Sequence, residues 1–256
     1  MKETRSILNS LVACGVALAM VSTLAAQSVD QGAAKVVRLK GAARYSTGNN
    51  VWQPLKVGDV VRPGTVIQTA SKSYVDLALG EGSAPASPAA PSPMKSYQPT
   101  AEQNALRIWE NTLLGVDKLT ATRTGADVVT ETQLDLKAGH ITGSVKKMSA
   151  ASKYEVKIPN GVAGIRGTFY DITAEGVVKV LSGSVVLAYV GPNGSVVTQV
   201  VNGPQQFDAR TGVLSPLSAG SQGDLESLER QLLAMGVAPG PVPVSADMSL
   251  LYISPH

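Results

Sequence analysis

The stretch from Tyr154 to Thr173, YEVKIPNGVAGIRGTFYDIT, constrains the fold more than any other part of the chain. Apolar and polar residues alternate from Tyr154 to Ile158, which predicts a strand with one buried face. Residues 159–161, Pro-Asn-Gly, predict a turn, because proline donates no backbone N–H and Asn-Gly favours tight reversals. A second strand is predicted over Thr168–Thr173. Two short strands around such a turn are typical of an all-β protein.

Glycines surround a single cation in the middle of this stretch. Gly161, Gly164 and Gly167 recur every third residue around Arg166, and this density implies positive φ angles or closely packed backbones. Arg166 could bind a partner carboxylate or an anionic ligand with bidentate geometry. It could instead have a structural role, donating to carbonyls and to a nearby acid such as Asp171. We favour the structural role, because burial among glycines favours internal hydrogen bonds.

Composition narrows the class of protein. The 256 residues are 44% apolar, which is enough to bury a core in one main domain. The net charge is +3, from 22 basic and 19 acidic residues, and no basic run stands out. The electrostatic footprint of a nucleic-acid-binding protein is therefore missing.

Residues 1–28 are predicted to be a secretory signal peptide. Lys2 and Arg5 precede an apolar run from Leu11 to Val21, which is too short to span a bilayer comfortably. An uncleaved anchor and lipidation of Cys14, the only cysteine, are the alternatives. We therefore expect an exported protein, periplasmic or on the surface of a bacterium, whose mature form has neither disulfide nor thiolate metal site.

The rest of the chain is predicted to be almost entirely β. Short strands separated by Gly, Pro and Asn turns begin at Lys35, and they predict a solenoid-like or sandwich domain over residues 35–215. Residues 82–99 form a Pro/Ala/Ser-rich insertion, predicted to be either an inert loop or a partner-binding polyproline segment. A helix is predicted over residues 222–236, because Leu225, Leu228 and Leu232 share one face. Residues 237–256 are a Pro-rich tail.

The sequence offers few groups for chemistry. It contains two histidines without metal-ligand spacing, and it has no nucleophile elbow, Walker loop or dinucleotide-binding glycine motif. We expect no catalytic residue, metal site or cofactor. Trp52 and Trp109 could be platforms for sugar rings, although partly buried aromatics on a sheet would look the same.

Two regions resemble the FecR domain family, named for the ferric-citrate sensor and regulator. The first contains Trp52, Pro54-Leu55, Gly58-Asp59, Pro63-Gly64, Thr69 and the alternating residues 74–79. The second contains Leu134, Leu136 and Gly139, followed by the family's most recognisable signature at Pro159, Gly161, Ala163, Arg166-Gly167-Thr168 and Phe169. The resemblance covers roughly residues 36–190, interrupted by the insertion.

The resemblance implies an all-β domain that signals across an envelope through contact with partner proteins. Only ten residues precede Leu11, so we expect the cytoplasmic anti-sigma segment of the full regulator to be absent. The leading hypothesis is a non-enzymatic exported module for sensing, signalling or protein interaction. The alternative is a structural or glycan-binding surface protein; an enzyme is a third hypothesis. The expected partner is an envelope protein or polysaccharide, with membrane contact only through an uncleaved signal segment.

Export can be tested directly. Fusion of residues 1–28 to a reporter that is active only outside the cytoplasm should give activity, because these residues have the organisation of a signal peptide. The mature N-terminus should lie downstream of the apolar run. A mature protein that still begins at Met1 would indicate an anchor instead.

Overall fold

The structure is a computed structural model that describes residues 29–49, 51–80, 104–124, 127–191 and 193–234. The predicted signal peptide, the insertion at 82–99 and the tail at 237–256 lie outside the described residues. The elements are β1 (Val29–Gln31), β2 (Ala33–Lys40), β3 (Ala43–Ser46), β4 (Gln53–Pro54), β5 (Val60–Val61), β6 (Thr65–Thr69), β7 (Tyr74–Gly80), β8 (Asn104–Ile108), β9 (Leu113–Thr124), β10 (Asp127–Ala138), β11 (His140–Ser144), β12 (Lys153–Ile158), β13 (Gly161–Thr173), β14 (Val177–Val190), β15 (Val196–Asn202), β16 (Gln205–Asp208), β17 (Val213–Pro216) and α1 (Ala219–Leu233).

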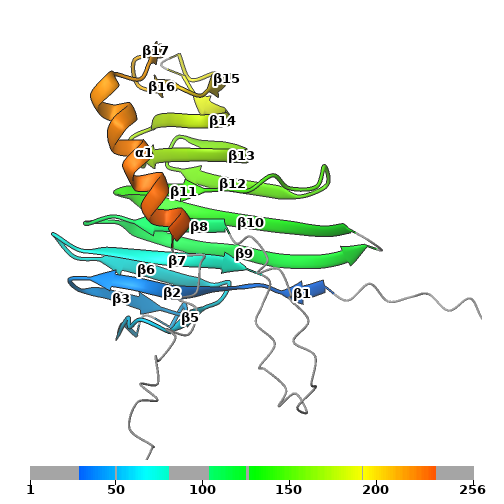
Figure 1. Ribbon diagram of the computed structural model, residues 1–256, viewed down its shortest axis with the longest axis vertical. Coiled ribbons are helices and arrows are strands. Elements are labelled where there is room, and N and C mark those ends of the chain that lie inside the picture. The colour runs from blue at the N-terminus through cyan, green and yellow to red at the C-terminus, as the bar shows by residue number, and fades with distance from the viewer. Residues whose placement is uncertain (1–28, 50, 81–103, 125–126, 192, 235–256) are drawn as a thin grey trace, which may run out of the picture.

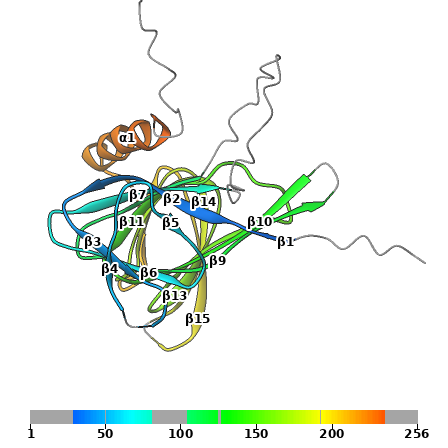
Figure 2. The same cartoon turned by 90° about the horizontal axis from the view of Figure 1, so that it is seen from below.

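The strands stack along the long axis of the molecule (Figure 1) and wrap around one core when seen along that axis (Figure 2). Pairing is antiparallel except between β10 and β12. The all-β class with one C-terminal helix is confirmed. Two walls can be followed through the pairings. The helix-side wall consists of β2, β7, β8, β11, the second half of β13, the first half of β14, β16 and β17. The far wall consists of β6, β9, β10, β12, the first half of β13, the second half of β14 and β15.

The core lies between the two walls and follows from residue alternation. In β7, Val75 and Leu77 are fully buried, and in β8 Leu106 and Ile108 are fully buried. Because successive side chains of a strand point to opposite faces, the residues between them point outward. The inward residues form one continuous apolar cluster that reaches from Ala34 to Phe207.

The long strands β13 and β14 belong to both walls, and both bend at a glycine. The register between them shifts after Arg166, at the point where Gly167 has a φ of +62° and Gly183 a φ of +79°. A Cβ on Gly183 would lie 2.3 Å from the carbonyl oxygen of Gly167. Only glycine fits this close approach and this backbone conformation. We call this bend the glycine corner.

Thr168 closes the gap that the glycine corner leaves in the ladder. Its hydroxyl donates to the carbonyl of Ser184, at 2.8 Å, and accepts the Ser184 N–H, at 3.1 Å. The Thr168 carbonyl accepts the N–H of Val145, at 2.9 Å. The predicted strand over Thr168–Thr173 is therefore the second half of β13, which runs unbroken from Gly161.

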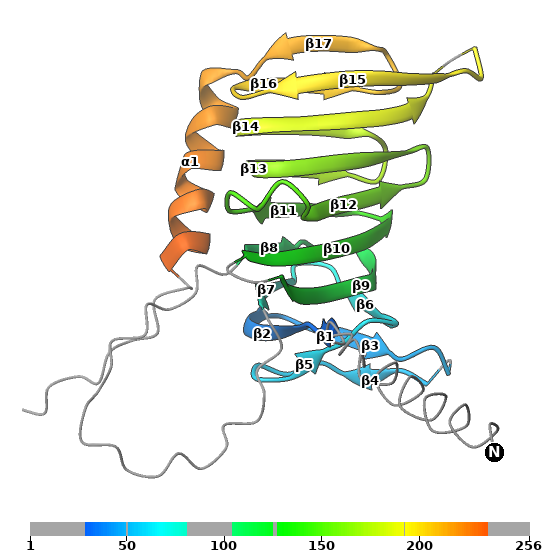
Figure 3. The same cartoon turned by 90° about the vertical axis from the view of Figure 1, so that its right-hand side faces the viewer.

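Helix α1 lies against the outer face of the helix-side wall (Figures 1 and 3). It begins after Ser218, whose hydroxyl accepts the N–H of Ser221. The predicted start at residue 222 is three residues too late, because the leucine spacing marks the buried face of the helix and does not include this N-cap. Leu225, Leu228 and Leu232 are buried as predicted; with Leu217 they pack on Phe169. Within the described residues, no helix has the length and apolar character needed to cross a bilayer.

Two tyrosines place their hydroxyls inside the core. Tyr154 and Tyr170 are almost fully buried, and their hydroxyl oxygens lie 3.0 Å apart. Desolvation raises the pKa of both hydroxyls well above the ordinary value. Gly143 makes room for this pair, because a Cβ there would lie 2.4 Å from the Tyr170 ring.

The tyrosine pair should make folding sensitive to alkali. The folded-state pKa of each tyrosine lies above its unfolded value of about 10. The stability that this difference contributes to the free energy of unfolding is complete below about pH 10 and is lost as the pH rises above that value. Each buried tyrosine should lower the free energy of unfolding by about 1.4 kcal/mol per pH unit in that range. Urea unfolding from pH 8 to 11 should show this slope, and the double variant Tyr154→Phe/Tyr170→Phe should show a shallower one. Equal slopes would contradict the assignment.

Candidate functional site: the polar cleft beneath helix α1

A row of polar side chains crosses the outer face of the helix-side wall. Asp76 on β7 lies opposite Arg107 on β8, which lies opposite Thr142 on β11. Thr142 lies opposite Asp171 on β13, and Asp171 lies opposite Lys179 on β14. These five residues, here called the polar row, are the outward counterparts of the apolar residues that fill the core.

Arg107 and Asp76 form an ion pair at one end of the polar row. The Arg107 Nε atom lies 2.6 Å from Asp76 Oδ1, and Nη2 lies 2.8 Å from Oδ2. The side chains are only 4% and 0% exposed. The two parallel bonds match the fork of a guanidinium to a carboxylate. Arg38, whose Nε lies 3.8 Å from Asp76, is a more distant second cation.

Aromatic rings and helix α1 cover the guanidinium of Arg107. Its central carbon lies 4.4 Å from the ring centroid of Tyr74 and 5.3 Å from that of Trp109. From α1, the Gln231 side-chain oxygen accepts a hydrogen bond from Nη1 at 3.4 Å. Two neighbouring aromatic rings and one polar helix residue therefore cover the cation, which removes it from water.

A second polar cluster occupies the middle of the row. Asp171 Oδ2 lies 2.6 Å from His140 Nε2 and accepts the Thr142 hydroxyl at 2.7 Å. The indole N–H of Trp109 donates to Thr142 Oγ1 at 2.8 Å, and the His140 ring stacks on Trp109 at 5.3 Å and 7°. Thr142 therefore accepts the indole N–H and donates its own proton to the carboxylate. The cluster orients the imidazole and the indole.

A cavity of about 520 Å³ separates this polar surface from helix α1. Arg107, Trp109, His140, Asp171 and Lys179 line it from the sheet, and Ser221, Asp224, Ser227 and Gln231 are among the helix residues that line it. Its volume is in the range of small-molecule sites, and its lining carries both charge signs. We call it the polar cleft. In the part of the chain that the structure describes, no three His, Cys, Asp or Glu residues gather as metal ligands would.

The structure does not bring Arg166 into this site. The side chain of Arg166 is exposed and makes no hydrogen bond or ion pair with any residue that the structure describes. The expectation that its guanidinium is buried is therefore wrong. It points outward from β13 opposite Ser184, just before the glycine corner, so the glycines beside it shape the backbone and do not enclose its side chain.

The signature glycines have different surroundings. A Cβ on Gly161 would lie 2.5 Å from the Ala188 carbonyl oxygen, so this position has no space for a side chain. At Gly164 the nearest atom would be 3.8 Å away, which is ordinary contact. Gly167 forms the glycine corner, and Thr168 closes it. These four residues lie along β13 and, unlike Asp171 on the same strand, do not line the polar cleft.

The two tryptophans also differ. Trp109 is half-buried, with its N–H donated and one neighbour stacked on its ring. Trp52 is 38% exposed and lines a separate cavity of about 570 Å³ with Gln53, Gln68 and Asn111. The guanidinium of Arg44 lies 4.6 Å from the Trp52 ring centroid. Of the two predicted platforms, Trp52 has the more exposed side chain.

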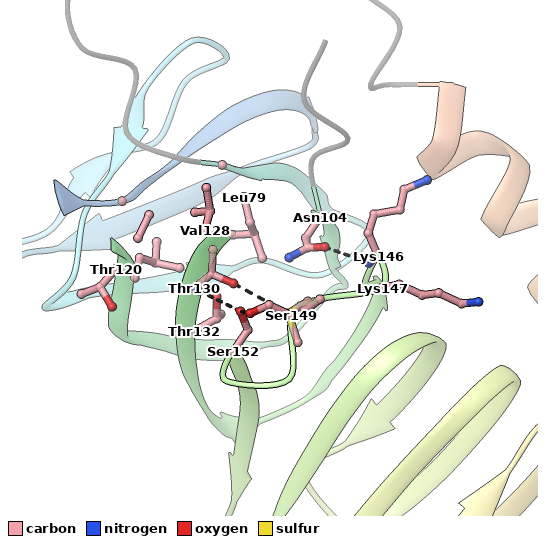
Figure 4. A pocket seen from close by; sticks show the side chains of 15 residues that line it. Leu79, Asn104, Thr120, Val128, Thr130, Thr132, Lys146, Lys147, Ser149 and Ser152 are labelled. Atoms are coloured by element: carbon pink, nitrogen blue, oxygen red, sulfur yellow. Dashed lines mark hydrogen bonds between the residues drawn. The ribbon is translucent and has the colours of Figure 1, made fainter. Parts of the chain in front are cut away.

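A further cavity of about 290 Å³ lies beside β9 and β10 (Figure 4). Ser152 Oγ in its lining accepts the backbone N–H of Thr130 at 2.9 Å and lies 2.9 Å from Ser149 Oγ. Lys146 and Lys147 line its rim, but their side chains extend away from it in Figure 4. These contacts hold the segment between β11 and β12 against β10.

The buried ion pair should dominate the stability of this region. Arg107→Ala leaves Asp76 buried without its main partner and should cost roughly 3–5 kcal/mol of unfolding free energy. Arg107→Lys should recover little, because an ammonium cannot reproduce the two parallel bonds. Arg166→Ala is the matched control and should change stability by less than about 0.5 kcal/mol. Urea unfolding of the three variants tests this; similar midpoints for Arg107→Ala and the wild type would refute it.

Comparison with known proteins identifies the segment that carries most of this surface. Residues 99–186 match the model of the FecR protein family, which covers the second of the two regions of resemblance. No curated protein sequence matches the chain. The crystal structure of a candidate anti-sigma factor from Parabacteroides distasonis ATCC 8503 aligns with a TM-score of 0.34 and 13% identity, covering 50% of this chain and 57% of that one. A likeness at that score supports no conclusion about function. On this match, residues 99–186 are similar to the FecR protein family.

Proposed function

We propose that this protein is an exported, non-enzymatic signalling module of a bacterial envelope, which acts by binding a partner protein. The observation that carries the proposal is the FecR match over residues 99–186. All five sheet residues of the polar cleft, from Arg107 to Lys179, lie within it. The organisation of residues 1–28 as a signal peptide supports export to the periplasm or cell surface.

The polar cleft is our proposed contact for the partner. Lys179 comes from the sheet and Asp224 from helix α1, so opposite charges face one cavity. A partner segment with charged side chains of both signs would complement this lining. Arg107 is already paired with Asp76, and His140 with Asp171. Lys179, which has no ion pair with any residue that the structure describes, is the residue we assign to partner contact.

Site-specific crosslinking in the native envelope tests the proposal. A photo-crosslinking residue at position 179 should capture a partner protein, whereas the same residue at Lys137, an exposed lysine on β10, should not. Lys179→Ala should weaken co-purification of the captured protein about tenfold or more, with an unchanged melting temperature, if the lysine meets a buried carboxylate. Capture from both positions, or equal co-purification by Lys179→Ala, would refute the cleft as the contact.

Glycan binding is the second candidate, and the exposed ring of Trp52 above its own cavity favours it. Planar amide and guanidinium groups beside an aromatic ring suit a sugar, whose apolar face stacks and whose hydroxyls need donors and acceptors. A second arm of the same experiment separates the two candidates. Binding of purified envelope polysaccharide that disappears in Trp52→Ala and persists in Lys179→Ala would favour the glycan-binding protein.

A further inference from the structure

Strand β15 forms an open edge of the far wall. Among the strands that the structure describes, it pairs with β14 alone, over seven residues from Val196 to Asn202. Its sequence, VVTQVVN, contains neither a charged residue nor a proline, the two features with which proteins usually protect an edge strand. Figure 3 shows β15 near the end of the stack.

In an antiparallel pair, alternate residues of each strand exchange hydrogen bonds with the partner strand, and the residues between them direct their backbone groups to the other side. One bond of the β14–β15 hairpin therefore shows which residues of β15 face away from β14. The N–H of Gly191 donates to the carbonyl of Ser195 at 2.8 Å, so odd-numbered residues of β15 bond to β14. Val196, Thr198 and Val200 therefore direct their N–H and C=O groups away from the sheet. The side-chain amide of Gln199 donates to the Val200 carbonyl at 2.7 Å. This local contact can be exchanged for a backbone N–H.

Exposed valines surround these free groups. Val196 is 74% exposed and Val200 is 45% exposed. Val196 lies opposite Val190, and Val200 opposite Val186, on β14. With Val162 of β13, they form a valine patch on the outer face of the far wall: Val162, Val186, Val190, Val196 and Val200. An apolar patch that ends at an open strand edge is a surface for strand addition.

We propose that two copies of this chain pair through β15, antiparallel and edge to edge. The register centres on Thr198, which lies opposite Thr198 of the second copy, with Val196 opposite Val200 on both sides. All three pairs join residues whose backbone groups face away from β14, so the register forms six hydrogen bonds once the Gln199 amide releases the Val200 carbonyl. It also places valine against valine and threonine against threonine, pairs that stabilise a sheet.

Charge and edge geometry favour a second copy as the occupant. On the outward face of the described parts of β13 and β14 that run beside β15, Arg166 is the one charged side chain. It pairs through Ser184 with Asn202, which lies outside the segment from Val196 to Val200 that forms the six hydrogen bonds. Like charges therefore do not meet across the two-fold axis. The adjacent edge strand β17 has four residues and contains Pro216, which suits it poorly for pairing. The contact is isologous and closes at two copies.

Sedimentation equilibrium of protein purified from cells expressing the full chain tests the assembly. The wild type should sediment as a dimer. Thr198→Pro should weaken association about tenfold or more, because each copy loses one intermolecular N–H. The intramolecular ladder keeps all its bonds, because that N–H does not face β14. Val213→Lys, at a valine that is 55% exposed on the edge strand β17, is the control and should remain dimeric.

Cysteine crosslinking tests the register without relying on the proline variant. In a Cys14→Ser background, Thr198→Cys should give a disulfide-linked dimer, because hydrogen-bonded partners lie about 5.5 Å apart between Cα atoms. Val200→Cys alone should not, since its two copies would be separated by about 13 Å. A mixture of Val196→Cys and Val200→Cys proteins should crosslink. A monomeric wild type at all concentrations would overturn the proposal and leave the edge to another protein. A dimer that Thr198→Pro leaves intact, or that Thr198→Cys does not trap, would also overturn it.

Discussion

The glycine corner is the constraint on which the rest of the structure depends. The paired strands β13 and β14 pass together from one wall to the other at this corner. The bend requires a left-handed backbone at Gly167 and at Gly183, and it brings the backbones of these two residues so close that neither a Cβ nor a larger side chain fits on Gly183. Thr168 supplies the bonds that the bent ladder lacks. Because the same strands continue on both sides of the bend, the core, the polar row and the valine patch are fixed relative to one another.

Much of the fold follows from local patterns. Alternation predicts the strands around the 159–161 turn, and the spacing of Leu225, Leu228 and Leu232 predicts the face of α1. The glycine corner is visible only as a glycine-rich signature, since its cause is the approach of Gly183 to Gly167. The environment of Arg166 could not be predicted from its sequence neighbours. The glycines around it suggest that its side chain is buried. In a strand, however, successive side chains point to opposite faces, so Arg166 lies on the outward face with Gly164, while Ile165 points into the core.

The polar row was harder to predict for a related reason. Leu106-Arg107-Ile108 and Val75-Asp76-Leu77 each place a charge at the outward position of an apolar strand, where a solvated side chain is the ordinary expectation. The ion pair arises because β7 and β8 are neighbours in one particular register and because α1 covers them. Neither condition can be read from one strand alone. The FecR segment supplies most of the polar row, whereas the covering helix lies outside the matched residues.

Helix α1 rests on the sheet through a narrow apolar contact. Three leucines hold it, each contributing about 1.5–3 kcal/mol, and one long hydrogen bond joins it to Arg107. The sheet is held by far more extensive pairing and burial. Helix α1 is therefore held by fewer contacts than the strands of the sheet, and elements with few buried apolar contacts are the ones that open locally at the lowest cost in free energy. Such an opening would return the Arg107–Asp76 pair to water, where ions are well solvated. The favourable free energy of hydrating that ion pair would offset part of the free energy lost when the leucines of the helix become exposed. The buried ion pair therefore lowers the free-energy cost of lifting the helix from the sheet.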